Sequence, residues 1–237
     1  MKDICLILTG TILPNAIYGL DDVEVSIRRN QYLLAFRFYR SIFNDPIIYI
    51  DNSGYDFKKD TNFMLQLSEL KIELIEFPRS VNTARGKGYQ EFEMLNYAAG
   101  LCNGKYLRFI KITGRYIYTN IAELVSSTEK HSIIIDRHVR FKSAITSLFV
   151  CEVKFYHEFL MDSYVLADDS TGNYIEKVLY KKLKEARSGT VSFFKTNPLW
   201  MVPNSKSNFY PYKFSSALIK LTNGMIRKLP GLPKYII

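Results

Sequence analysis

The sequence predicts an α/β fold with a mostly parallel sheet flanked by helices. Short apolar runs, typical of strands buried on both faces, recur up to about residue 135. Segments with helically spaced apolar residues lie between these runs, and this alternation is typical of parallel sheets. Ligands of such sheets bind outside the carboxyl ends of the strands, so the polar loops at those ends are the candidate site.

The elements follow in order along the chain. The apolar run 4–8 predicts a first strand closed by Thr9-Gly10-Thr11, and helical spacing over 28–43 predicts a helix that stops at Asn-Asp-Pro. The run PIIYI predicts a second buried strand, and the alternating IELIEF predicts a third. The predicted strands are 4–8, 46–50, 72–77, 106–112 and 132–135, and the predicted helices are 28–43, 63–70, 89–101 and 174–187. After about residue 145 the alternation becomes less regular.

Composition indicates a globular protein with one substantial domain. The chain has 237 residues, of which 47% are hydrophobic and 23% charged. With 32 Lys and Arg against 23 Asp and Glu, its net charge of +9 favours an anionic partner such as nucleic acid, a phosphorylated metabolite or an acidic membrane surface. Three widely separated cysteines predict buried thiols rather than a zinc site or disulfides. No signal peptide or membrane span is evident, so we expect a cytosolic protein.

Two strand-end loops could contact a nucleotide. Asp51 and Asn52 follow the second strand, where a carboxylate could accept hydrogen bonds from a ribose or a base, or could cap its own turn. The segment from Arg85 through Lys87 to Gly88 precedes a helix. Its glycines and the helix N-terminus would suit a phosphate, although a solvated basic turn has the same pattern.

Two further loops carry groups suited to catalysis. Lys111 and Arg115 flank Thr-Gly after the apolar run YLRFI, and an ammonium beside a guanidinium suits a diphosphate. Asp136 and His138 offer a carboxylate and an imidazole for general-base or metal chemistry. The polar stretch around Asp168 and Asp169, with Glu176 on the following helix, supplies more carboxylates.

Taken in order, these motifs resemble those of GT-A-type glycosyltransferases, and most closely the small bacterial enzymes of capsule, O-antigen and other surface-polysaccharide synthesis. The resemblance covers roughly residues 1–190. It rests on the order of elements, on "RGKGYxE" in the segment that begins Asn82-Thr-Ala84-Arg85, and on "KITGRY" where the family has a strand ending in D-x-D. It implies a GT-A-like (Rossmann-like) fold and transfer of a sugar, from a UDP-sugar of the UDP-galactose type, to a hydroxyl of a lipid-linked or oligosaccharide acceptor.

The resemblance also implies roles for individual residues. Asp51 would bind uridine beside Thr9, Gly10 and Asn52, and a catalytic carboxylate would lie in the later acidic stretch, which favours Asp168 or Asp169. Arg85, Lys87, Lys111 and Arg115 would bind the diphosphate.

One departure concerns the metal. The D-x-D that binds Mn²⁺ or Mg²⁺ in the family is absent, and Lys111 and Arg115 stand in its place. We therefore expect either metal-independent catalysis or a divalent cation held elsewhere, with Asp136 and His138 as its candidate ligands. No cofactor is otherwise indicated.

The end of the chain differs from the rest. We divide the chain into a glycosyltransferase domain, 1–208, and a basic, aromatic tail, 209–237. A helix within the tail would place Leu218, Leu221, Met225 and Leu229 on one face and cations on another. This suits an amphipathic helix at an anionic membrane interface, on the cytoplasmic face where lipid-linked acceptors are built. A helix docked on the domain or a dimer contact would have the same pattern.

Two other classes of protein share some of these features. A nucleic-acid-binding protein would explain the net charge, but its aromatic residues lie mostly in apolar strand and helix positions, and no RNA- or DNA-binding motif is present. We therefore expect no nucleic-acid partner. A nucleotidyltransferase would need paired acidic metal ligands and a glycine-rich first loop. Thr9-Gly10-Thr11, with its single glycine, gives only weak evidence for such a loop. The donor sugar, the acceptor and the oligomeric state are not determined by the sequence.

Overall fold

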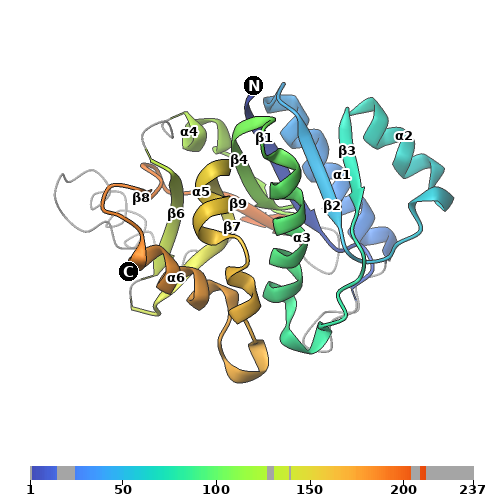
Figure 1. Cartoon of the computed structure of the whole chain (residues 1–237). Coiled ribbons are helices and arrows are strands. Elements are labelled where there is room, and N and C mark those ends of the chain that lie inside the picture. Colours follow the sequence, from blue (N-terminus) through green and yellow to red (C-terminus); the bar gives the residue numbers. More distant parts are fainter. Residues whose placement is uncertain (1, 15–24, 127–130, 139, 204–208, 212–237) are drawn as a thin grey trace.

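The computed structural model describes residues 2–14, 25–126, 131–138, 140–203 and 209–211. Its centre is a seven-stranded sheet in the order β3-β2-β1-β4-β7-β6-β8 (Figure 1). Four neighbouring strands run parallel: β3 (Ile72–Glu76), β2 (Ile47–Asp51), β1 (Lys2–Gly10) and β4 (Tyr106–Thr113). The predicted α/β fold with a mostly parallel sheet is confirmed.

The other half of the sheet contains a strand that sequence patterns did not reveal. β7 (Ser143–Glu152) lies between β4 and β6 (Ile133–His138) and is antiparallel to both. β8 (Val191–Ser192) pairs with the far edge of β6. A second sheet joins β5 (Ile117–Tyr118), β9 (Trp200–Pro203) and β10 (Phe209–Pro211). The first residues assigned to the tail therefore pair with β9.

The predicted helices are all present within a few residues of their expected bounds. They are α1 (Val25–Ile42), α2 (Thr61–Glu69), α3 (Lys87–Cys102) and α6 (Ile175–Glu185). Two short helices, α4 (Ile121–Val125) and α5 (Val153–Phe155), were not expected. Single turns lie at Phe57–Lys59, Thr83–Arg85, Tyr156–Leu160, Ser163–Leu166 and Asp169–Thr171.

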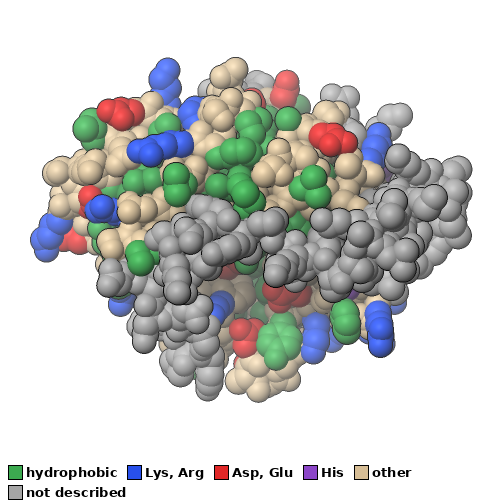
Figure 2. Space-filling view, turned by 180° about the vertical axis from the view of Figure 1, so that it is seen from behind, with side chains coloured by type: hydrophobic (Ala, Val, Ile, Leu, Met, Phe, Trp, Pro, Cys, Tyr) green, Lys and Arg blue, Asp and Glu red, His purple; other side chains and the backbone are tan. Residues whose placement is uncertain are grey.

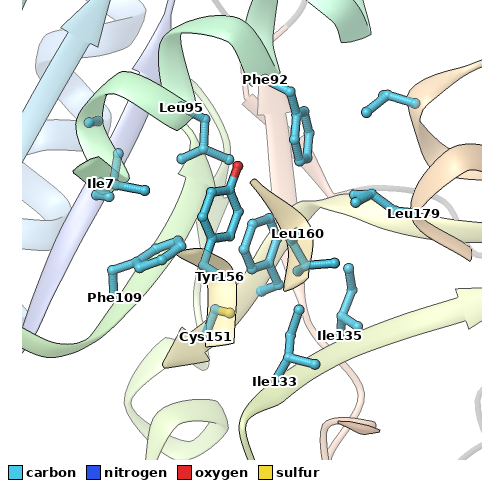
Figure 3. Packing of buried hydrophobic residues seen from close by; sticks show 14 of the residues in the cluster. Ile7, Phe92, Leu95, Phe109, Ile133, Ile135, Cys151, Tyr156, Leu160 and Leu179 are labelled. Atoms are coloured by element: carbon cyan, nitrogen blue, oxygen red, sulfur yellow. The ribbon is translucent and has the colours of Figure 1, made fainter. Parts of the chain in front are cut away.

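The sheet separates two hydrophobic cores because its side chains alternate between faces. Figure 1 shows α3, α5 and α6 in front of the sheet and α1 behind it. In the front core, Phe92 and Leu95 of α3 and Leu179 of α6 pack with Phe109 of β4 and with Tyr156 (Figure 3). The rear core contains the side chains of Leu6 and Leu8 with those of α1, α2 and α4. Both faces of the parallel strands are thus covered, so a ligand must approach their ends.

The three cysteines are buried free thiols, as predicted, and the Sγ atoms of Cys5 and Cys102 lie 3.4 Å apart. Among the described residues, no helix has the length and apolar character needed to cross a bilayer. Figure 2 shows the face opposite to that of Figure 1, where the Lys and Arg side chains are scattered rather than gathered in one patch. The predicted membrane-interface helix falls within 212–237, outside the described residues.

Candidate active site

A cavity of about 180 Å³ opens at the carboxyl ends of β1, β2 and β4. The chain leaves β1 toward β2 on one side, whereas β4 lies on the other, so this is the point where the strand order reverses. The lining combines strand ends with residues of α1 and α3: Thr9, Gly10, Thr11, Pro14, Arg28, Tyr32, Asn52, Lys87, Gln90, Glu91, Met94, Thr113 and Arg115. Five of the twelve residues predicted for the site are among them: Thr9, Gly10, Asn52, Lys87 and Arg115.

Two arginines line the α1 side of the cavity. Arg28 is buried and donates to the carbonyl oxygens of Thr11 and Ile12, which ties α1 to the loop after β1. Arg115 donates to Gln31 Oε1 at 2.8 Å. Burial, together with the charge of Arg115, lowers the pKa of Arg28 despite the opposing effect of Tyr32. A bound anion would relieve this repulsion between the two cations, so the wall is suited to phosphate.

The sequence placed Lys111 on the diphosphate, but the structure gives it another position. Its side chain is 0% exposed, and its Nζ donates to Glu91 Oε1 at 2.7 Å and to the Thr146 carbonyl oxygen at 2.7 Å. The reason is strand alternation: residues 109, 111 and 113 share the face covered by α3, and Glu91 lies on that helix. Lys111 is therefore a buried partner of Glu91 and does not line the cavity.

The glycines of the RGKG segment are explained by packing. Gly86 has φ 99° and ψ 177°, a region essentially restricted to glycine. A Cβ there would lie 1.9 Å from Asp169 Oδ2. A Cβ on Gly88 would lie 2.4 Å from Ile175 Cγ2. The Lys87 backbone N–H donates to Asp169, so the start of α3 already holds one of the protein's own carboxylates. Of the groups in this segment that were expected to contact phosphate, the Lys87 side chain is the one that remains available to the cavity.

Arg85 lies outside the cavity. Its guanidinium stacks on the Tyr89 ring at 4.5 Å and donates to the Val165 carbonyl oxygen.

The structure assigns Asp51 to the turn that follows β2. Its carboxylate is 1% exposed and accepts from the Ile12 N–H, the Tyr49 hydroxyl, and the N–H and hydroxyl of Ser53. Burial raises its pKa, although these hydrogen bonds act in the opposite direction. The turn-capping alternative thus describes Asp51 better than uridine binding. The neighbouring Asn52 does line the cavity, where its Oδ1 accepts from Thr11 Oγ1 at 2.7 Å.

The candidate catalytic residues divide into two groups, neither of which lines the cavity. Asp136 is buried in β6 and accepts from the Phe194 N–H at 3.3 Å, and His138 packs its ring 6.0 Å from that of Phe141. The intervening strand β7 separates this pair from the end of β4. That separation could not be foreseen without β7.

Asp168 and Asp169 occupy the turn that packs against the start of α3. Asp168 accepts from the N–H and the hydroxyl of Ser170, and these bonds lower its pKa. Burial raises the pKa of Asp169, and the charge of Asp168 adds to that effect. Burial also raises the pKa of Glu176, whose Oε1 accepts from Thr146 Oγ1 at 3.3 Å. Of the four predicted catalytic residues, Asp169 contacts a cavity-lining residue, Lys87.

The end of β4 does not suit the divalent cation that the resemblance implies. Lys111 lies near the end of β4 and Arg115 just beyond it, and Glu91, the carboxylate that contacts Lys111 and Thr113, is already paired with Lys111. In the part of the chain that the structure describes, no group of three or more His, Cys, Asp or Glu side chains could hold a metal ion.

Two charged residues of the cavity lining, Glu91 and Arg28, had no role in the sequence analysis. Glu91 falls within the quoted RGKGYxE motif, but its pairing with Lys111 depends on how α3 crosses β4. Arg28 lies in the predicted first helix, and a single arginine in a basic helix gives no signal of its own. Both could have been noticed as charged residues at positions that helical spacing places against the sheet.

Comparison with known proteins supports the fold. No family model matches the sequence, and no curated protein matches it. A protein assigned as a nucleotide-diphospho-sugar transferase from Desulfovibrio desulfuricans G20 superimposes with a TM-score of 0.53 and 10% identity, over 82% of this chain and 80% of its own. The fold is GT-A-like. The glycosyltransferase GlyE of Streptococcus pneumoniae TIGR4 gives a TM-score of 0.50 and 9% identity over 82% of this chain. This chain spans only 45% of GlyE.

Proposed function

We propose that this protein is a glycosyltransferase that moves a sugar from a nucleotide sugar, a UDP-sugar of the galactose type, to an acceptor hydroxyl. The observation that carries the proposal is the cavity at the strand-order reversal, with Arg28, Lys87 and Arg115 in its wall. Three cations around so small a space favour a ligand with more than one negative charge, such as a diphosphate. The GT-A-like fold supports a nucleoside attached to it.

Five residues of the cavity lining have a part in this proposal. Asn52 and Thr11 would contact the nucleoside at the ends of β1 and β2. Arg28, Arg115 and Lys87 would bind the diphosphate and stabilise the charge that develops on it as it leaves, which is the part a divalent cation plays elsewhere. The positions of these cations are fixed by α1, by the turn after β4 and by the start of α3.

The acceptor hydroxyl must lose its proton as its oxygen bonds to the anomeric carbon and the nucleoside diphosphate departs. We propose Asp169 as the base, because burial raises its pKa and it contacts the first residue of α3. Asp169→Asn should then reduce turnover far more than Asp168→Asn. Because Asp169 also caps α3, equal melting temperatures for the two variants are the necessary control. Equal turnover would remove Asp169 from this role.

A thermal-shift screen tests the proposal directly. The ligands are UDP, GDP, CMP and a short oligonucleotide, followed by turnover measurements with the matching nucleotide sugars. We expect stabilisation by a nucleoside diphosphate and release of that diphosphate during turnover. Stabilisation by the oligonucleotide alone would refute the proposal, and release of pyrophosphate from a nucleoside triphosphate would indicate a nucleotidyltransferase. Adding EDTA and then Mn²⁺ to the turnover assay determines the metal requirement.

We further propose that the acceptor is lipid-linked or an oligosaccharide of surface-polysaccharide synthesis, at the cytoplasmic face of the membrane. The support is the composition of 209–237, with its aromatic residues and evenly spaced cations. Flotation with anionic liposomes tests it. A chain truncated after residue 211 should float much less than the intact chain, and equal flotation would contradict the membrane role of the tail.

A further inference from the structure

Glu91 is a carboxylate in the wall of an otherwise cationic cavity. It lies in α3, one turn after Lys87, and lines the cavity beside Gln90 and Met94. A negative charge in this position weakens the binding of any phosphate next to it. Its presence therefore needs an explanation that the diphosphate alone does not provide.

The structure shows how one oxygen of Glu91 is used. Oε1 accepts three hydrogen bonds, from Thr9 Oγ1 at 2.6 Å, Lys111 Nζ at 2.7 Å and Thr113 Oγ1 at 3.0 Å. These donors come from β1 and β4, so they fix the carboxylate against the ends of the two strands at the strand-order reversal. Burial would raise the pKa of Glu91, but the charge of Lys111 and these hydrogen bonds outweigh it and hold the pKa below its usual value.

The second oxygen, Oε2, accepts none of the hydrogen bonds found among the described residues. The Glu91 side chain remains 23% exposed, and it lines the cavity. An ionised carboxylate is acceptor-only, so a ligand group that satisfies Oε2 must be a hydrogen-bond donor. The neighbouring cations disfavour an ammonium group there. Among the neutral donors of a nucleotide sugar, hydroxyl groups are the most numerous, and both the ribose and the sugar carry them.

We infer that Glu91 is a specificity-determining residue that accepts a hydrogen bond from a hydroxyl group of the nucleotide-sugar donor through Oε2. The hydroxyl belongs either to the transferred sugar or to the ribose of the nucleotide. Lys111 is a positioning residue, because it acts on the ligand only through Glu91. The inference rests on the proposed function. Together, the cations and the fixed carboxylate would orient the donor, with its diphosphate toward Arg28 and Arg115 and its hydroxyls toward α3.

Glu91→Gln is the first test because it keeps an oxygen for Thr9, Thr113 and Lys111 while replacing the second acceptor with an NH₂ donor. It also leaves the charge of buried Lys111 unbalanced. The double variant Glu91→Gln/Lys111→Met removes both charges and retains the two threonine hydrogen bonds. Glu93→Gln, on the same helix but outside the cavity lining, is the matched control.

Calorimetric titration with ligand pairs that differ only by the sugar separates the two sources of the hydroxyl. The pairs are UDP with UDP-galactose, the donor proposed above, and GDP with GDP-mannose. Losing a hydrogen bond to a charged group should weaken binding roughly 10- to 100-fold. A loss confined to the nucleotide sugar assigns the contact to the sugar. An equal loss for the nucleoside diphosphate, together with weak binding of its 2′- or 3′-deoxy analogue to the wild-type protein, assigns it to the ribose.

The inference is overturned if the folded Glu91→Gln and double variants bind both members of a pair as tightly as the wild-type and Glu93→Gln proteins do. That result would leave the proposed function intact, because the wild-type protein would still bind the nucleotide sugar. If the wild-type protein binds neither pair, the proposed function fails, and this inference fails with it.

Discussion

Removing Lys111 should destabilise the protein through the charge left on Glu91. In Lys111→Met the stem of the side chain is retained, but the ammonium that balances Glu91 is lost from a site that is 0% exposed. Breaking a buried ion pair by removing one partner costs about 3–5 kcal/mol. Since Glu91 is 23% exposed and keeps its two threonine donors, we expect the lower end, about 3 kcal/mol. For a chain of this length, that corresponds to a fall in melting temperature of roughly 6–12 °C.

The double variant Glu91→Gln/Lys111→Met should recover most of this loss, because replacing both charges removes the imbalance. Thermal unfolding at pH 7 of the wild type, both single variants and the double variant gives the coupling energy of the pair. Lys154→Met breaks an exposed pair with Glu158 and serves as the control, for which we expect no measurable change. A melting temperature of Lys111→Met within 2 °C of the wild type would refute the buried-pair interpretation.

The pH dependence gives an independent check on the same pair. The wild-type pKa of Glu91 is lowered, so its contribution to the free energy of unfolding is present above the ordinary glutamate pKa, about 4.3, and is lost as the pH falls through the folded-state pKa. In Lys111→Met the pKa should rise, because the compensating charge is gone. The difference in melting temperature between the two proteins should therefore shrink as the pH approaches 4. A difference that stays constant from pH 7 to pH 4 would contradict this assignment.

Three further outcomes follow from the site. Arg115→Ala should weaken nucleoside diphosphate binding roughly 10- to 100-fold with little change in melting temperature, whereas Arg37→Ala on the exposed side of α1 should change neither. Gly86→Ala should lower the free energy of unfolding by about 1–3 kcal/mol or more, measured in urea, because it adds a clash with a carboxylate to a glycine-only conformation. Gly104→Ala, with φ 73° and nothing within 4 Å, measures the cost of a positive φ where no clash is added. Glu176→Gln should raise the melting temperature at pH 7 and have no effect below about pH 4, because a raised pKa in the folded state means that the ionised form costs stability.

The parallel half of the fold could be predicted because each strand is buried on both faces and reads as an apolar run. The runs around Ile7, Ile48 and Phe109 are short and bounded by turn residues, so each strand was located, although β1 extends two residues beyond the predicted run at each end. β7 was missed although its sequence, SAITSLFVCE, is rich in β-branched and aromatic residues. It lies beyond the regular β-α alternation. It pairs antiparallel with β6 through a hairpin, so no helical segment separates the two strands in the sequence and indicates where β7 begins.

The site was predicted at the correct edge of the sheet, but the residues that line the cavity differ in part from the predicted ones. Strand-end loops identify an edge, and Asn52, Lys87 and Arg115 reach the cavity from three of them. The sequence does not reveal which polar side chains form their hydrogen bonds with nearby backbone groups instead of a ligand. Asp51 is such a side chain, because its carboxylate accepts from two backbone N–H groups. The sequence also does not reveal that the glycines beside Lys87 are required by close packing, of Gly86 against Asp169 and of Gly88 against Ile175 at the start of α6.

Lys111 and Arg115 show why two cations four residues apart should not be assigned one role. A strand places residues 109, 111 and 113 on one face, so Lys111 points toward α3 for as long as β4 continues. β4 ends at Thr113, and Gly114, whose N–H still donates to the Thr9 carbonyl oxygen, begins the turn at a position where a Cβ would lie 3.2 Å from the Tyr32 ring. The turn carries Arg115 to the α1 side, where it reaches Gln31. One cation therefore neutralises a carboxylate of the cavity wall, and the other lines the cavity itself. Under the proposed function, Glu91 of α3 would supply a hydrogen-bond acceptor and Arg115 a positive charge to the same donor molecule.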